Sequence, residues 1–282
     1  MIVVTGATGQ LGRLVIAELL KKVPAANVVA AVRNIEKAKD IAALGVQVRH
    51  ADYDQPASWD GALKGADKVL LISSSEIGKR APQHKAVIEA AARAGVKLLA
   101  YTSILRADTS PLGLAAEHKA TEAMIRASGL PHAFLRNGWY LENYQHPIHV
   151  AVEHGAVHGC AGNGKISAAS RLDYAAAAAE VLVGNKQGVF ELAGDKAFTL
   201  SDLAAEISRQ SGKSIGYVNL TEPEFRDALL KAGLPLPFAE LLADSDTGIS
   251  RGDLFDNGGQ LGKLIGRPTM PLADGVAAAL KG

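Results

Sequence analysis

The feature that most constrains the fold is a glycine-rich loop at the start of the chain. Residues 6–12 are Gly-Ala-Thr-Gly-Gln-Leu-Gly, between the β-branched run Ile2–Thr5 and the amphipathic helical stripe Leu11–Leu19. A strand, a glycine turn and a helix N-terminus in this order point backbone N–H groups and the positive end of the helix dipole at a pyrophosphate. The loop therefore predicts a dinucleotide site, and a tight turn without a ligand is the alternative. The contacting residues would be Gly6, Thr8, Gly9, Gln10, Leu11 and Gly12.

Short apolar runs alternate with helical patterns through the first half of the chain. The predicted strands are Ile2–Thr5, Asn27–Val32, Val46–His50, Lys68–Ile72, Lys97–Thr102 and Pro131–Leu135. Six strands alternating with five helices are typical of a Rossmann-type, doubly wound parallel sheet in the α/β class.

The rhythm changes after about Asn137. The sequence predicts a helix over Ser170–Leu182, a short strand over Val189–Leu192 and a further helix that begins with the capping box Thr199-x-x-Asp202. We therefore predict an NADP-binding domain over residues 1–138 and a smaller α-rich substrate lobe over residues 139–282, with an approximate boundary that the chain is free to cross again.

Composition excludes several classes of protein. A length of 282 residues corresponds to about two domains, and 48% apolar residues are enough for a buried core. The net charge of +1 provides no field for nucleic acid, and no apolar stretch approaches the roughly 20 residues of a membrane span. A single cysteine, Cys160, cannot form an internal disulfide and favours a reducing compartment. No basic leader precedes the first strand, so we expect a cytoplasmic protein.

The residue after the second strand bears on the choice of cofactor. NAD-binding folds carry an acidic residue there for the ribose 2′-hydroxyl, whereas this chain has Val32-Arg33-Asn34. A guanidinium binds a 2′-phosphate through two charge-assisted hydrogen bonds, so Arg33 favours NADPH. The alternative is that Arg33 is only solvated and that Glu36 supplies the missing carboxylate.

The loops that leave the other strands should carry the rest of the site, because ligands of open α/β sheets lie beyond the carboxyl ends of the strands. Ser73, Ser74 and Ser75 follow the fourth strand and would let a cofactor approach closely. Trp139, Tyr140 and Tyr144 follow the sixth strand. Their rings offer stacking surface for a flat ligand, or they pack the smaller lobe.

Several further motifs occur together. They are Val32-Arg33-Asn34, Ser73–Ser75 followed by Ala81-Pro82-Gln83-His84, Tyr101-Thr102-Ser103, Glu117-His118, Leu135-Arg136-Asn137-Gly138-Trp139-Tyr140, Ala193-Gly194-Asp195 and Leu264-Ile265-Gly266. With the glycine loop, they make the chain resemble the type-2 NAD(P)H:quinone oxidoreductases of the NmrA-like atypical short-chain dehydrogenase family over essentially its whole length. The resemblance implies a cleft between two domains, NADPH, and flavin-free two-electron reduction of quinones.

The resemblance also implies roles for the segment after the sixth strand. Asn137 and Gly138 would contact the cofactor, while Tyr140 and Asn143 would face the quinone. The chain lacks the Tyr-x-x-x-Lys pair of typical short-chain dehydrogenases, which disfavours alcohol–ketone interconversion. His118, on the helix after the fifth strand, is a candidate proton donor, although a solvated helix histidine is the alternative.

These observations favour an NADPH-dependent quinone reductase that transfers hydride directly to a stacked quinone. The alternatives are a redox sensor that binds NADP(H) without turnover and a reductase of another planar acceptor, such as a triarylmethane dye. We expect no metal, because no carboxylate or thiolate completes a zinc site with His146, His149, His154 and His158. The expected partner is a small-molecule quinone and not nucleic acid. The sequence is compatible with a homo-oligomer.

Overall fold

A computed structural model describes residues 1–281 of the chain. The chain forms two compact units. The first contains Met1–Ala107, Ala116–Asn137 and Arg171–Glu191, and the second contains Asp108–Ala115, Gly138–Ser170 and the part from Leu192 onward. The chain leaves the first unit after Asn137, next to the predicted boundary, but residues 171–191 return to it.

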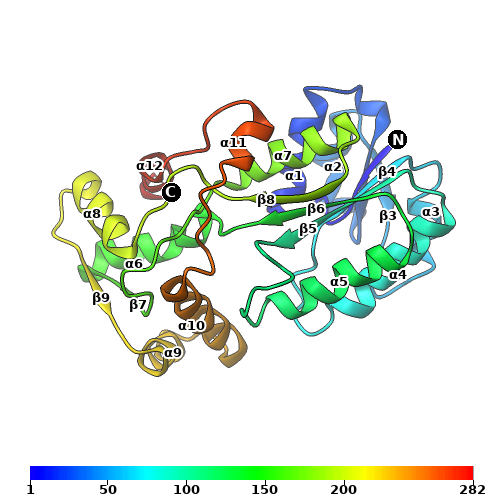
Figure 1. Cartoon of the computed structure of the whole chain (residues 1–282). Coiled ribbons are helices and arrows are strands. Elements are labelled where there is room, and N and C mark those ends of the chain that lie inside the picture. The colour runs from blue at the N-terminus through cyan, green and yellow to red at the C-terminus, as the bar shows by residue number, and fades with distance from the viewer. Residues whose placement is uncertain (282) are drawn as a thin grey trace. The chain divides into compact units, whose positions relative to one another are not determined.

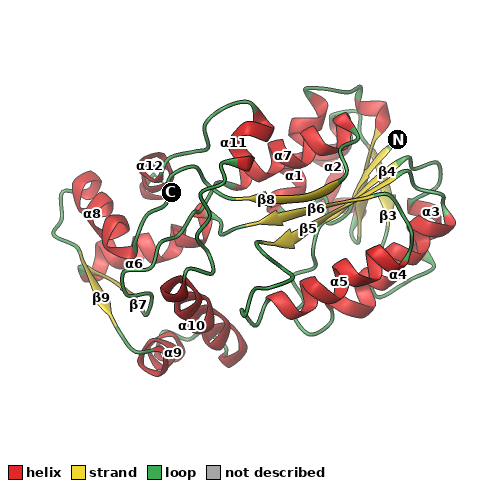
Figure 2. Ribbon diagram, viewed as in Figure 1, coloured by secondary structure: helices red, strands yellow, loops and turns green. Residues whose placement is uncertain are grey.

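The first unit is built on a seven-stranded sheet (Figures 1 and 2). Its strands are β1 (Ile2–Val4), β2 (Val28–Val32), β3 (Gln47–His50), β4 (Lys68–Leu71), β5 (Leu98–Ile104), β6 (His132–Asn137) and β8 (Gly188–Leu192). They lie in the order β3-β2-β1-β4-β5-β6-β8, and the pairings from β3 to β6 are parallel. The predicted Rossmann-type fold is confirmed, with β8 as a seventh strand of the sheet.

Helices cover both faces of this sheet (Figure 1). They are α1 (Gln10–Leu20), α2 (Lys39–Ala43), α3 (Ser58–Ala62), α4 (Arg80–Arg93), α5 (Ala115–Ala127) and α7 (Arg171–Gly184). α1 packs against α7 on one face, and α4 and α5 lie on the other. Val3, Leu71, Leu99 and Phe134 are fully buried between the sheet and α3 to α5. Because β1 and β4 are neighbours, the connections reverse direction between them, and such a switch point opens a crevice beyond the strand ends.

The second unit is rich in helices. It contains α6 (Gln145–His154), α8 (Leu200–Ser211), α9 (Glu222–Lys231), α10 (Leu236–Arg251), α11 (Gln260–Ile265), α12 (Leu272–Leu280) and a parallel pair of strands, β7 (Ala156–Gly159) and β9 (Gly216–Asn219). The predicted capping box of α8 is present, since Thr199 and Asp202 bond reciprocally to each other's backbone N–H. Across residues 1–281, none of the helices combines the length and the apolar character that a membrane crossing needs.

Candidate active site

The glycine loop connects β1 to α1 and requires glycine for different reasons at different positions. Gly6 has φ of +57°, a left-handed conformation that favours glycine. At Gly12 a β-carbon would lie 2.4 Å from the Gly6 carbonyl oxygen, so the packing of the loop excludes any side chain there. Gly9 differs, because it is exposed and a β-carbon would meet only the Gly6 oxygen, at 3.1 Å. At Gly9, therefore, the lack of a side chain leaves the backbone exposed on the outer surface of the loop.

The N-terminus of α1 has the properties of an anion site. Gly9 is its N-cap, no side chain caps the helix, and the first turn contains no acidic residue. By contrast, α8 and α9 both start with capping boxes. The first N–H groups of an α-helix have no acceptor within the helix, so the backbone at Gln10, Leu11 and Gly12 is available to an anion. Thr8 is half-buried and Gln10 is exposed beside it, whereas the Leu11 side chain packs inward.

Arg13 on α1 stabilises the glycine loop through hydrogen bonds to backbone carbonyls. Its Nε donates to the Thr8 carbonyl at 3.1 Å, and its Nη2 donates to the Lys37 carbonyl at 2.9 Å. It also pairs with Asp40, and this hydrogen bond lowers the pKa of the Asp40 carboxyl. Arg13 thereby links the glycine loop to the segment after β2. Sequence patterns do not identify Arg13 as a support of the loop, because two of its partners, Lys37 and Asp40, lie more than 20 positions away.

Arg33 directly follows β2 and extends into solvent. Its side chain is 70% exposed, and its Nη1 lies 3.8 Å from Oε1 of Glu76 in the loop after β4. Asn34 accepts hydrogen bonds from the N–H groups of Glu36 and Lys37, which fixes the turn that follows. The Glu36 carboxylate is exposed and pairs with Lys39. The guanidinium is therefore accessible at the carboxyl end of the sheet.

The serine loop after β4 is held by its backbone. The Ser73 N–H donates to Thr102 Oγ1 at 2.8 Å, and the Ser74 N–H donates to His84 Nε2 at 3.0 Å. Arg80 Nε donates to the Ser74 carbonyl at 2.5 Å. Ser73 is half-buried, Ser74 is buried and Ser75 is exposed. These bonds fix the predicted cofactor loop on the side chains of β5 and α4.

Two buried histidines continue this network. With its Nε2 accepting from Ser74, His84 carries its proton on Nδ1, which lies 2.9 Å from Thr121 Oγ1. His118 places Nδ1 2.7 Å from the Tyr101 hydroxyl and Nε2 3.4 Å from Arg80. Burial, with the charge of Arg80 adding to it, lowers the pKa of each histidine to about 3.

His118 is therefore neutral at neutral pH. The prediction of His118 as a proton donor rested on a pKa near neutrality, and its environment removes that premise. The solvated alternative is wrong, because His118 is only 6% exposed.

A buried ion pair lies under the end of β6. Arg136 donates to both oxygens of Glu122, at 2.9 and 2.8 Å, and to Glu191 at 2.8 Å. Ser103 Oγ donates to Glu122 at 2.7 Å. Asn137 follows Arg136 and accepts from the Leu105 N–H at 3.0 Å through its carbonyl. The fully paired charges fix the backbone just before the predicted cofactor contact at Asn137.

The second unit contains the predicted acceptor segment. The Leu141 N–H donates to the Ala169 carbonyl at 3.0 Å, and the Ala169 N–H donates to Trp139 at 3.1 Å. Tyr140 and Asn143 are half-buried, and the Asn143 N–H donates to the Tyr140 carbonyl at 3.1 Å. The segment starts at Gly138, whose N–H donates to the Leu192 carbonyl at 2.8 Å.

Tyr144 has a different environment. It is buried, with its ring edge-on to Phe198 at 5.9 Å, so this aromatic residue packs the lobe.

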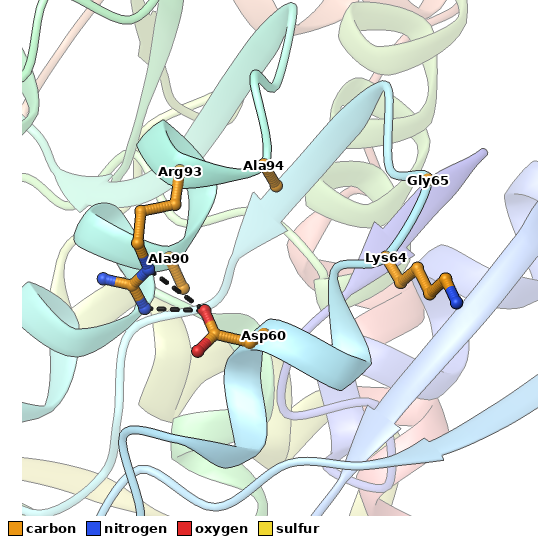
Figure 3. A pocket seen from close by; sticks show the side chains of 6 residues that line it. All are labelled: Asp60, Lys64, Gly65, Ala90, Arg93 and Ala94. Atoms are coloured by element: carbon orange, nitrogen blue, oxygen red, sulfur yellow. Dashed lines mark hydrogen bonds and ion pairs between the residues drawn. The ribbon is translucent and has the colours of Figure 1, made fainter.

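A pocket of about 330 Å³ lies elsewhere on the first unit (Figure 3). Asp60 from α3 and Arg93 from the end of α4 form an ion pair across it, with Arg93 Nη2 2.7 Å from Asp60 Oδ1. Lys64 and Gly65 lie just before β4, so the pocket is at the amino end of the strands. None of the predicted site residues lines it.

Comparisons with known proteins give one consistent picture. A family model described as NAD(P)H-binding matches residues 6–184. The chain is 57% identical over 279 residues to Quinone oxidoreductase 2 of Escherichia coli, covering 98% of each sequence. It superposes with a TM-score of 0.97 on the E. coli NADPH-dependent quinone oxidoreductase solved with NADPH, at 56% identity over 99% of this chain and 100% of that one. The Citrobacter triphenylmethane reductase solved with NADP(H) gives a TM-score of 0.94 at 40% identity, over 99% and 100%.

Proposed function

This chain belongs to the NAD(P)H-binding family, and from that premise we propose that it is an NADPH-dependent quinone oxidoreductase. The family resemblance inferred from the motifs is confirmed. The observation that carries the function is the 57% identity to a quinone oxidoreductase over nearly the full length of both chains. The enzyme would catalyse the two-electron reduction of a quinone, in which hydride and one proton convert the quinone to a hydroquinone.

The first unit would hold the cofactor. NADPH, when bound, supplies the hydride. The backbone N–H groups at the start of α1 would bind the pyrophosphate, and the bare surface at Gly9 would let it approach. Arg33 would bind the 2′-phosphate, while Ser73–Ser75 and Asn137 would line the remainder. Gly138, which belongs to the second unit, would contact the cofactor as well. Residues that bind through backbone need a rigid support, which the hydrogen bonds of His84 and Arg80 to Ser74 provide.

The acceptor would lie against Tyr140 and Asn143 of the second unit. Neither side chain is a strong acid at neutral pH, so each would orient the quinone or donate a hydrogen bond to the oxygen that gains negative charge. A quinone accepts hydride readily and its anion is delocalised, so the proton can come from water. Proximity and orientation would therefore supply most of the acceleration.

Steady-state kinetics test this proposal directly. We expect NADPH to be oxidised stoichiometrically with a simple benzoquinone, without added flavin. Tight NADPH binding with no turnover on any quinone would instead favour the redox sensor.

A dye reductase is the second candidate, because the 40% identical relative is named as a triphenylmethane reductase. The ratio of kcat/KM for benzoquinone to that for a cationic triarylmethane dye separates the two activities. We expect the ratio to favour the quinone, and a higher value for the dye would reverse the assignment.

Removal of polar groups from the acceptor segment tests the proposed substrate contacts. We expect Tyr140→Phe and Asn143→Ala each to lower kcat/KM for the quinone by less than the roughly 10²–10³ of a dominant oxyanion hole. NADPH affinity should stay unchanged. Tyr217→Phe, which removes another hydroxyl from the same unit, is the control and should keep full activity. If both test variants also keep full kcat/KM, the acceptor binds elsewhere.

The pH profile tests the role of His118. Because its pKa is lowered to about 3, His118 should not titrate between pH 6 and pH 8. We expect the profiles of kcat/KM for wild type and His118→Gln to have the same shape over this range. Loss of an ionisation near neutrality in the variant alone would show that His118 does transfer a proton.

The setting of the enzyme is part of the proposal. The lone cysteine, Cys160, fits a reducing environment, and we propose the cytoplasm. The partner would be the small-molecule quinone.

A further inference from the structure

We propose that Glu76 controls the preference for NADPH over NADH by competing with the 2′-phosphate for Arg33. This inference rests on the proposed function, because it assumes that Arg33 binds the phosphate. Glu76 lies in the loop after β4, between two cations. Its Oε1 is 3.8 Å from Arg33 Nη1, and its Oε2 is 3.4 Å from Lys79 Nζ.

The backbone of Glu76 has a fixed position. Its N–H donates to Ser74 Oγ at 3.2 Å, and its carbonyl accepts from the Lys79 N–H at 3.1 Å. Ser74 is in turn held by His84 and Arg80, as described above. The loop therefore keeps the Glu76 carboxylate at the carboxyl end of the sheet, where Arg33 is also located. The carboxylate is 39% exposed, so solvent screens it only partly.

The chemistry of the pair follows from its charges. A 2′-phosphate and the Glu76 carboxylate are both anions and need the same guanidinium. When the phosphate takes Arg33, Glu76 loses one of its two cations and keeps Lys79. NADH carries no charge at this position, so its binding leaves the Arg33–Glu76 pair intact. The carboxylate should therefore weaken the binding of NADPH but not that of NADH.

Glu76→Gln should tighten NADPH binding. Exposed charges several ångströms apart interact weakly, so we expect NADPH affinity to increase by about two- to fivefold. NADH affinity should change less than about twofold. Calorimetry at low and high salt gives both dissociation constants, and adenosine 2′-monophosphate serves as a probe that does not depend on turnover. The gain should shrink at high salt, because the charges are partly exposed.

Matched variants separate competition from other effects. Glu36→Gln removes an exposed carboxylate that pairs with Lys39. It should leave the ratio of the NADPH and NADH dissociation constants unchanged. In an Arg33→Ala background, the gain from Glu76→Gln should fall to less than half, because there is no guanidinium to compete for. A full gain in NADPH affinity in that background would show that Glu76 does not compete for Arg33 but repels the 2′-phosphate directly. Unchanged or weaker NADPH binding by Glu76→Gln would overturn the proposal outright.

The outcome also distinguishes this inference from the proposed function. If wild type binds NADPH and reduces quinone but Glu76→Gln behaves like wild type, only the role of Glu76 fails. If wild type binds neither cofactor, the proposed function fails and this inference falls with it.

Discussion

Valine at position 9 is expected to abolish NADPH binding while the protein stays folded. Gly9 has φ of −73° and ψ of 167°, an extended conformation that any residue adopts, and it is exposed. A β-carbon would meet only the Gly6 oxygen at 3.1 Å, which a small shift relieves. The valine methyl groups, however, would stand in front of the bare N-terminus of α1, where the pyrophosphate must approach. Calorimetry measures the binding, and circular dichroism with Tm verifies the fold.

Two other glycines provide the controls for this variant. Gly12→Val should fail to fold, since its β-carbon would lie 2.4 Å from the Gly6 oxygen and 2.8 Å from the Ala7 α-carbon. Gly61→Ala on α3 should change neither fold nor binding, because no atom lies within 4 Å of the new β-carbon. Wild-type NADPH affinity in a folded Gly9→Val protein would count decisively against the glycine loop as the pyrophosphate site.

The same local rules explain why most of the fold could be predicted from the sequence. Most of the strands from β1 to β6 are apolar runs bounded by turn residues, and β1, β2 and β5 are buried throughout, as expected for a sheet covered on both faces. β3 is the exception, because its sequence Gln-Val-Arg-His is polar and partly exposed. The α8 capping box is equally local, because Thr199 and Asp202 satisfy each other within one turn. Patterns of this kind identify an element, but they do not say against what it packs.

For this reason the sequence assigned residues 171–191 to the wrong unit of the fold. The sequence predicts a helix and a strand there, and both exist as α7 and β8. Their position after the change of rhythm suggested the smaller lobe, yet α7 packs on α1 and β8 extends the sheet next to β6. Most alanines of α7, among them Ala177 and Ala178, are buried on the first unit. Small residues permit such close packing without specifying its partner.

The residues of the candidate site also fall into two groups, those that a local pattern identifies and those that depend on tertiary contacts. The positions of the glycine loop and Arg33 in the fold could be predicted, because the strand order places both at the carboxyl end of the sheet. Arg80 and His84 were not identified as supports of the serine loop, because their role depends on α4 facing Ser74. The sequence predicts for His118 the pKa of an ordinary histidine, whereas burial in the fold, with the charge of Arg80 adding to it, lowers that pKa. Side chains that act through tertiary contacts carry no local signal.

Removing the guanidinium of Arg33 is expected to discriminate sharply between the two cofactors. Arg33→Ala should weaken NADPH binding by ~1.5–3 kcal/mol, the range for hydrogen bonds to charged groups. That corresponds to a loss of about 10- to 150-fold in affinity. NADH binding should be almost unaffected, because NADH lacks the 2′-phosphate and the exposed Arg33 side chain pairs only loosely with Glu76, at 3.8 Å.

Arg93→Ala is the matched control for this prediction. Arg93 is also an exposed arginine paired with a carboxylate, Asp60, but it lies at the amino end of the strands (Figure 3). Its loss should change neither dissociation constant. Arg33→Lys should fall between wild type and Arg33→Ala, since lysine keeps the charge but lacks the planar fork that binds a phosphate through two bonds. Equal losses for NADPH and NADH in Arg33→Ala, or no loss for either, would show that Arg33 does not recognise the 2′-phosphate.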